Sequence, residues 1–307
     1  MPIKNSFIFV LLLLSSHLFL NGLTVDLDYS YDTNNFFGSS GSDQRQSLDE
    51  ASSFLENRID DNLGQLNPSG SNTWDWNFTH PGTGSNTSVS NPTAQTDTVR
   101  LFVGGRALGG PLGVGGPVGF SASGSSSWLN AISDRDTNAE FQPYAGVASF
   151  DTSADWYFDT DASNTESGML SGKNDFFSVA VHEMLHALGI GGSDAWSGIV
   201  SGNFYTGTEV STLFGGDVPI DDGVHFEEGL SSEYWDGSNF VSQEVSIDPT
   251  LTTGTRKYTT EMDFALMQDI GIDVQPVPEP KWTFFFVSGV CMLFVWRNRC
   301  YSRKFYS

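Results

Sequence analysis

The stretch that decides the fold is Val181-His182-Glu183-Met184-Leu185-His186-Ala187-Leu188-Gly189-Ile190-Gly191. It completes a segment, residues 174–188, in which apolar side chains recur at helical spacing and Asn174 or Asp175 can cap the N-terminus. Gly189 supplies the left-handed residue that ends such a helix. Two histidines four positions apart project from one face of a helix, so both imidazoles can reach a single ion. The stretch therefore predicts a helix that carries part of a metal site.

The glutamate between the histidines adds a chemical function. In the pattern His-Glu-x-x-His, this residue takes a proton from water activated by zinc and later delivers it to the leaving amine. A catalytic zinc ion has three protein ligands and one open position, so His182 and His186 need a third partner. The pattern predicts zinc as the cofactor and Glu183 as the general base.

Histidine is scarce in this chain, which narrows the search for the third ligand. The chain has five histidines, of which His17 lies near the N-terminus and His80 in a loop well before the helix. His225, in the segment 221–229, is the best remaining candidate, and the alternative is an ordinary loop histidine. We therefore predict that His182, His186 and His225 bind the metal.

Both ends of the chain have the layout of targeting segments. Lys4 precedes an apolar run, which predicts a signal peptide over residues 1–22, with a membrane anchor as the alternative. Residues 276–307 contain Pro278-Glu279-Pro280, an apolar stretch over 282–296 and a basic tail. This order resembles the PEP-CTERM sorting signal of Gram-negative bacteria, which an exosortase is thought to process; the alternative is an ordinary C-terminal membrane anchor. Either interpretation predicts an exported domain over residues 23–275, in the periplasm, at the cell surface or in the extracellular matrix.

The acidic charge suits an extracellular setting, with simple solubility as the alternative, and the exported domain has no cysteine although its compartment would permit disulfides. All 37 acidic residues lie between residues 23 and 280, against eight basic ones, which gives this segment a net charge of −29. Such a surface repels nucleic acid and anionic lipid, so we expect no nucleic-acid partner. The two cysteines, Cys291 and Cys300, both lie in the C-terminal segment, so the exported domain has no disulfide.

The remaining pattern predicts an α+β fold. Alternation over residues 23–31 indicates a strand, and helical spacing follows over 43–63. We expect a loop over 64–98, a strand over 98–103, a glycine-rich irregular or edge strand over 108–124, and short strands over 146–150 and 156–158. After the motif helix, residues 190–255 are expected to be mostly loop, and 259–270 a helix. This order predicts one small mixed sheet with an active-site helix and a C-terminal helix.

From residue 176 onward the motifs resemble metzincin-like bacterial zinc peptidases with PEP-CTERM tails. The resemblance covers roughly residues 98–275 and includes Gly223-Val224-His225-Phe226, which is similar to that group's distal histidine segment. In metzincins the third ligand normally falls three residues after the motif glycine, where this chain has Gly192. A third histidine displaced by a long insertion is similar to leishmanolysin-type enzymes. A methionine is expected just before Asp248, and this chain has Ile247.

The resemblance implies an exported zinc-dependent endopeptidase that acts on proteins or peptides. Gly192 and Ile247 motivate the alternative, a catalytically inactive anchored matrix or adhesion protein that keeps the peptidase fold. A hydrolase of non-peptide amides is a third possibility. Matrixin-like peptidases also bind calcium in acidic loops comparable to Asp155, Asp159 and Asp161, which suggests Ca²⁺ as a second metal, with a solvated acidic loop as the alternative.

Overall fold

The computed structural model describes residues 22–162, 169 and 172–277, and its centre is a mixed four-stranded sheet. The strand order is β1 (Thr24–Asp28), β4 (Thr98–Arg106), β7 (Ala145–Asp151) and β5 (Gly113–Pro117). β1, β4 and β7 are parallel, whereas β5 pairs antiparallel with β7 and forms one edge. β4 is buried over most of its length because both faces of the sheet are covered, which explains its nearly continuous apolar sequence.

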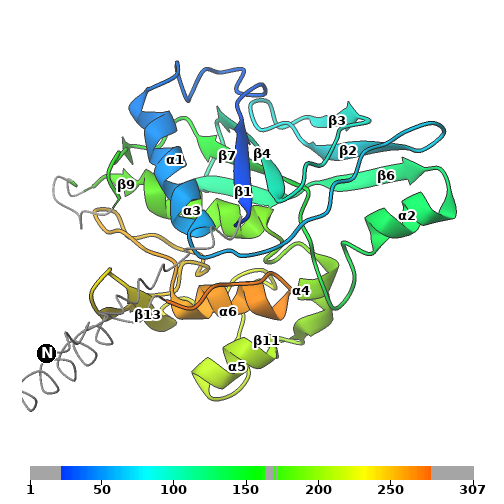
Figure 1. Ribbon diagram of the computed structural model, residues 1–307. Coiled ribbons are helices and arrows are strands. Elements are labelled where there is room, and N and C mark those ends of the chain that lie inside the picture. The colour runs from blue at the N-terminus through cyan, green and yellow to red at the C-terminus, as the bar shows by residue number, and fades with distance from the viewer. Residues whose placement is uncertain (1–21, 163–168, 170–171, 278–307) are drawn as a thin grey trace, which may run out of the picture.

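Two helices cover one face of this sheet, as Figure 1 shows: α1 (Asp43–Glu56) and α3 (Phe176–Ala187). Leu101 and Val103 of β4 point into the core that these helices share. Leu48 and Leu55 of α1 are completely buried there. α3 also packs against β5 and β7, so the predicted motif helix lies beneath the edge strand.

A second layer covers the opposite face of the sheet. The antiparallel strands β3 (Asn86–Ser90), β2 (Thr73–Thr79) and β6 (Gly119–Ser123) form a three-stranded sheet, and α2 (Ser126–Ser133) follows β6. Trp74, Trp76 and Phe78 alternate along β2 and pack with Phe102 of β4. This aromatic layer gives the main sheet its second buried face.

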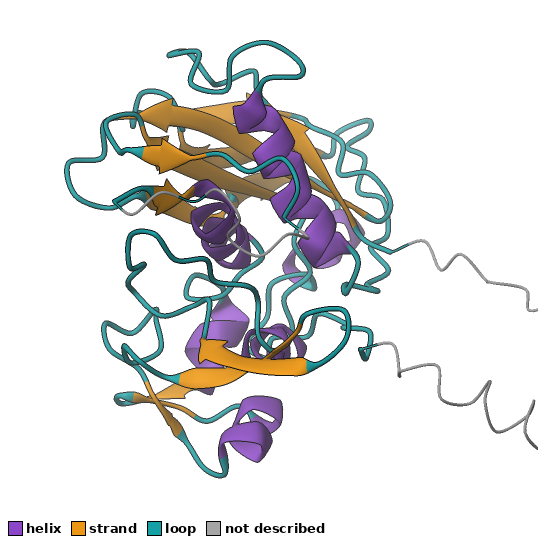
Figure 2. Ribbon diagram, turned by 90° about the vertical axis from the view of Figure 1, so that its left-hand side faces the viewer, coloured by secondary structure: helices purple, strands orange, loops and turns teal. Residues whose placement is uncertain are grey.

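The chain after α3 forms the lower part of the molecule in Figures 1 and 2. It consists of short elements: α4 (Asp194–Ile199), β10 (Val200–Ser201), β11 (Phe204–Tyr205), α5 (Thr208–Phe214), β12 (Val218–Pro219) and the hairpin of β13 (Ser231–Trp235) and β14 (Phe240–Glu244). The final helix, α6 (Glu261–Asp269), lies between this part and the motif helix. Two short strands, β8 (Trp156–Tyr157) and β9 (Asn174–Asp175), lead into α3.

The predicted α+β class with a small mixed sheet is confirmed. Residues 64–98 were wrongly predicted as loop, because glycine, serine and asparagine obscured the alternating aromatics of β2. The first helix ends earlier than predicted, at Asn57, and Ile59 then bridges to Val274. Within the described part, no helix is long and apolar enough to cross a membrane. The predicted targeting segments lie outside the described residues, apart from residues 22, 276 and 277.

Candidate metal centre

Helix α3 positions two histidines because its N-terminus is fixed from two sides. Asp175 caps the helix through a hydrogen bond that its carboxylate accepts from Ser178 N. The same carboxylate accepts two hydrogen bonds, of 2.9 and 2.8 Å, from the buried guanidinium of Arg256. At the other end, Gly189 has φ +109°, which ends the helix as the sequence predicts.

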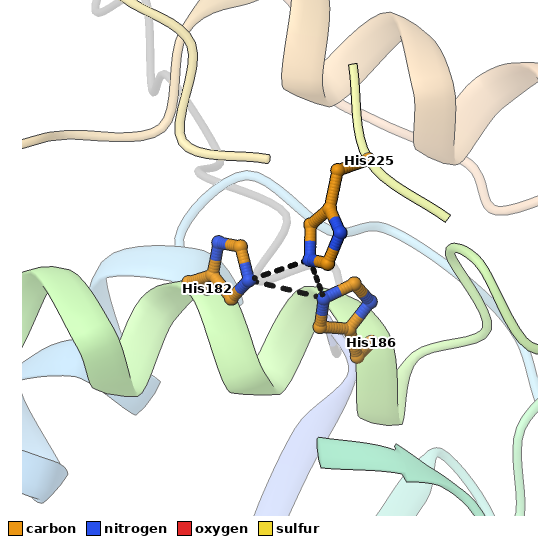
Figure 3. A group of neighbouring side chains, drawn as sticks. All are labelled: His182, His186 and His225. Atoms are coloured by element: carbon orange, nitrogen blue, oxygen red, sulfur yellow. Dashed lines mark hydrogen bonds between the residues drawn. The ribbon is translucent and has the colours of Figure 1, made fainter. Parts of the chain in front are cut away.

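The structure brings His225 next to the two histidines of α3. The Nε2 atoms of His186 and His182 are 3.0 Å apart, those of His186 and His225 are 3.1 Å apart, and those of His225 and His182 are 3.3 Å apart (Figure 3). These histidines are the one group of three or more potential metal-binding side chains in the described parts of the chain. The third histidine predicted from sequence thus lies beside the two histidines of α3.

A hydrogen bond on the far side of each ring decides which nitrogen carries the proton. His182 Nδ1 lies 2.7 Å from the Ser246 carbonyl oxygen, and His186 Nδ1 lies 2.9 Å from the Ile190 carbonyl oxygen. His225 Nδ1 lies 2.9 Å from a carboxylate oxygen of Asp222. Carbonyl and carboxylate oxygens accept hydrogen bonds, so each Nδ1 carries the proton and donates, and each neutral ring presents a lone pair at Nε2.

The protonation of the two helix histidines follows from their surroundings. Burial, together with the neighbouring His186 ring, places the pKa of His182 well below its usual value. Burial likewise lowers the pKa of His186 to about 4. Both rings are therefore neutral at pH 7, and the short contacts drawn in Figure 3 bring lone pairs together rather than a donor and an acceptor.

This donor set fits a zinc ion. Nitrogens that each lie about 2.0–2.1 Å from one tetrahedral zinc ion are separated by about 3.3 Å, close to the separations found. A cation between the rings would also relieve the repulsion of three converging lone pairs. The outer hydrogen bonds to Ser246, Ile190 and Asp222 fix each ring's orientation, as second partners of zinc-binding histidines commonly do.

Glu183 lies beside this cluster beneath the edge strand. Its side chain is buried, and burial raises the pKa of the carboxyl to about 8, although a hydrogen bond from Gly115 N opposes the shift. A Cβ atom at Gly113 would overlap the Glu183 carboxylate, and one at Gly115 would overlap its carbonyl oxygen. The glycines of β5 therefore allow the strand to lie directly on this carboxylate.

Asp263 of α6 holds the turn that supports His182. Its carboxylate accepts hydrogen bonds from Ser246 N at 2.9 Å and Ile247 N at 3.1 Å. It also accepts from Thr260 N and Thr260 Oγ1 at the start of α6, where the two residues form a capping box. Ile247 occupies the position where the resemblance to metzincin-like peptidases predicts a methionine, and its side chain is fully buried in the main core.

Asp222 and Asp263 are parts of the site that sequence patterns did not predict. Asp222 lies three residues before His225, and the spacing of Thr260 and Asp263 is a capping signal. Neither local signal shows that these carboxylates support a histidine. His80 lies elsewhere, in a turn where its Nδ1 accepts from Gly82 N.

The acidic loop before α3 gives no support to the prediction of calcium. Asp155 forms an ion pair with Lys173, and Asp159 lies 3.0 Å from the Arg256 guanidinium. The described residues contain no group of three carboxylates that could hold a cation at this loop. The cations of the chain itself therefore neutralise part of the charge that would attract one.

The three histidines lie in a groove formed by two adjoining cavities. The first cavity, about 430 Å³, extends from Glu183 toward residues 246–251 and Lys257. The second cavity, about 380 Å³, extends from Glu183 along residues 113–117 toward residues 190–192. His182, Glu183 and His225 line both cavities. A molecule that occupies the groove would therefore pass His182, Glu183 and His225.

Comparison with known proteins adds a family-level finding. A family model described as matrixin, Peptidase_M10, matches residues 134–220. The match includes α3 with His182, Glu183 and His186, and it ends before His225. Neither the curated proteins nor the solved structures contain a significant match to the chain. The matrixin match supports a zinc metallopeptidase at the level of the family, and matrixins use zinc.

Proposed function

We propose that this protein is an exported zinc-dependent endopeptidase, with His182, His186 and His225 as the metal ligands and Glu183 as the general base. The observation that carries the proposal is the convergence of three Nε2 lone pairs beside a buried carboxylate. Bound zinc would supply Lewis acidity, which polarises a carbonyl oxygen and lowers the pKa of water to about 7.

Glu183 is suited to proton transfer in this place. Its raised pKa, about 8 without the positive charge of a metal, makes it a group that can both accept and donate a proton near neutral pH. It would accept a proton from the attacking water and deliver it to the leaving amine. The hydrogen bond from Gly115 N orients its carboxylate toward β5.

The groove favours a peptide over a small amide. β5 lines the second cavity and has β7 as its only neighbour in the four-stranded sheet. The edge strand can therefore pair with an extended peptide through backbone hydrogen bonds, which need no particular side chain. An extended chain along the groove would present an internal peptide bond to Glu183, and the product would be that of an endopeptidase.

The place of action is also part of the proposal. The signal peptide over residues 1–22 and the sorting segment over 276–307 support export to the periplasm, cell surface or extracellular matrix of a Gram-negative bacterium. The sorting segment would attach the metallopeptidase domain, residues 23–275, to the membrane at least transiently, and an exosortase would process that segment. The third histidine displaced by a long insertion, as in leishmanolysin-type enzymes, belongs to the same proposal.

Zinc analysis together with casein digestion tests the proposal. We expect the full-length chain to bind one zinc ion and digest casein, and Glu183→Ala to retain zinc without digesting it. His225→Ala should lose zinc, whereas His80→Ala serves as the matched histidine control and should retain it. Equal digestion by Glu183→Ala and wild type would refute the mechanism. A folded wild-type protein without zinc would favour the inactive matrix or adhesion protein.

A further inference from the structure

The walls of the groove differ sharply in charge. Residues 107–133, which include β5, contain no charged side chain. Between Lys173 and Arg256 the sequence has thirteen acidic residues and no lysine or arginine. The segment that contributes α3, His225 and residues 246–251 to the groove therefore carries negative charge only.

The first cavity is lined by both apolar and polar side chains. Val179, Leu251 and Leu112 are among the apolar residues that line it. Besides His182, Glu183 and His225, its polar lining consists of Ser178, Asp222, Ser246, Asp248, Thr250 and Lys257. Such a cavity can hold the aliphatic part of a long side chain and place its end among polar groups.

Lys257 is the one lysine or arginine of this lining, and its charge is already paired with two carboxylates. Its ammonium group contacts Asp248 Oδ1 at 2.7 Å, the Thr250 carbonyl oxygen at 2.7 Å and Glu244 Oε2 at 2.9 Å. Two of its three hydrogens are donated to Asp248 and Thr250, and the Glu244 carboxylate forms an ion pair with the same ammonium group. An acidic side chain in the cavity would find no free cation in this lining and would face the negative charges of Asp222 and Asp248.

Two residues of the same lining, Ser246 and Asp248, each have a buried oxygen without a hydrogen-bond partner in the described part of the chain. Ser246 is 3% exposed and Asp248 is 1% exposed. Among the described residues, the Ser246 hydroxyl and Asp248 Oδ2 have no hydrogen-bond partner. Asp222, which also lines the cavity, is half exposed, and its carboxylate accepts hydrogen bonds from His225 and Val224. Buried acceptors without donors are uncommon and are satisfied when a ligand supplies the donor.

We propose that the first cavity binds a lysine or arginine side chain, so that the substrates of this enzyme are cationic peptide segments. The inference rests on the proposed peptidase function and names its substrate class. A cation with several donors matches the unused acceptors at Ser246 and Asp248 and the charge of Asp222. A carboxylate in the same place would be desolvated without a partner, which is strongly unfavourable.

Three matched peptides test the preference: fluorescein-labelled (Leu-Gly-Lys)₄ and the same peptide with Gln or Glu in place of Lys. Binding to the zinc-loaded full-length Glu183→Ala variant is measured by fluorescence anisotropy at low salt, so that no peptide is cleaved. We expect the Lys peptide to bind at least about tenfold more tightly than the Gln peptide, and the Glu peptide to bind most weakly. The ratio of Lys-peptide to Gln-peptide affinity should fall as the salt concentration is raised.

Variants in the same background separate the cavity from the overall negative charge. Glu244→Gln and Asp248→Asn should each reduce the ratio of Lys to Gln affinity at least about threefold. Glu209→Gln, which removes an exposed charge on α5, should leave the ratio unchanged. Glu244 is a partly exposed partner of Lys257, so its variant tests the proposal even if Asp248→Asn fails to fold.

Each outcome has a definite meaning. Equal affinity for the Lys and Gln peptides overturns the inference. The inference also fails if Glu209→Gln reduces the ratio of Lys to Gln affinity as much as the cavity variants do, because the preference would then come from net charge. The same peptides are then offered to wild type. Cleavage without preference refutes the inference alone. A cavity-dependent binding preference without cleavage of these peptides or of casein refutes the peptidase function and supports the cationic site.

Discussion

Asp263 gives the sharpest test of how the fold supports the metal centre. Replacement of Asp263 by Asn keeps the size of the side chain but exchanges one acceptor oxygen for an amide donor. The remaining oxygen can still accept from Ser246 N and from Thr260, as Oδ2 does in the wild type. The new amide group would then face Ile247 N, which now donates to Oδ1 at 3.1 Å.

The expected loss of stability follows from these hydrogen bonds. One hydrogen bond to a charged group, worth about 1.5–3 kcal/mol, disappears, and a backbone N–H is left without a partner at a residue that is fully buried. Loss of the charge weakens the remaining bonds as well. We therefore expect Asp263→Asn to lower the free energy of unfolding by about 3 kcal/mol.

A second effect should appear at the metal. Ser246 accepts the Nδ1 proton of His182, so a displaced turn would disturb that ring. We expect zinc affinity to fall about 10–100-fold, as it does when outer partners of metal-binding histidines are lost. Urea unfolding with a chelator present measures stability, and chelator competition measures zinc affinity.

The exposed Asp217→Asn is the matched control and should change the unfolding free energy by less than about 0.5 kcal/mol. If Asp263→Asn behaves like this control, the assignment of Asp263 as the support of the turn is refuted. Lower stability with unchanged zinc affinity would refute only the coupling to His182.

Three further changes test other features. Asp222→Asn removes the carboxylate that accepts from His225 Nδ1, and zinc should bind about 10–100-fold more weakly in chelator competition; unchanged affinity would exclude this role. Gly115→Ala would place a methyl group on the Glu183 carbonyl oxygen, and casein hydrolysis should fall about 100-fold while zinc content persists; full activity would show that β5 can move away. Asp61 is buried, one of its carboxylate oxygens has no partner in the described residues, and burial raises its pKa to about 6. Because the pKa in the unfolded chain is about 3.9, the folded state binds the proton more tightly, and wild type loses stability as the pH rises from about 4 to about 6. Asp61→Asn removes this loss of stability. In urea unfolding, the variant should be more stable than wild type by about 1–2 kcal/mol at pH 8 and equally stable at pH 4. The same gain at both pH values would show that the raised pKa of Asp61 is not the cause.

The motif helix could be predicted because its signals are local. Asp175, the apolar spacing and Gly189 lie within one continuous segment, and the structure begins and ends α3 close to the predicted positions. The strand β2 was missed for a related reason. Its alternating Trp74, Trp76 and Phe78 lie in a segment whose composition is otherwise that of a loop, and they form a strand because β6 and β3 pair with it on both sides.

The third histidine shows the limit of sequence reasoning. His225 could be selected because few histidines were available, yet spacing could not place it, since it lies 39 residues after His186. Its position depends on residues 190–224 folding into a compact unit that returns to α3. The role of the three histidines as ligands stays a proposal, although their proximity is a feature of the structure.

By itself, the sequence determined the motif helix, the two histidines and glutamate on it, the α+β class and the excess of negative charge. These features depend on neighbouring residues or on composition. The tertiary structure alone decided that Ser246, Asp222 and Ile190 orient the three rings, that Asp263 holds the turn under His182, and that glycines of β5 lie on Glu183. These contacts join segments far apart in the chain, and hydrogen bonds and close packing between such segments exist only once the core has formed.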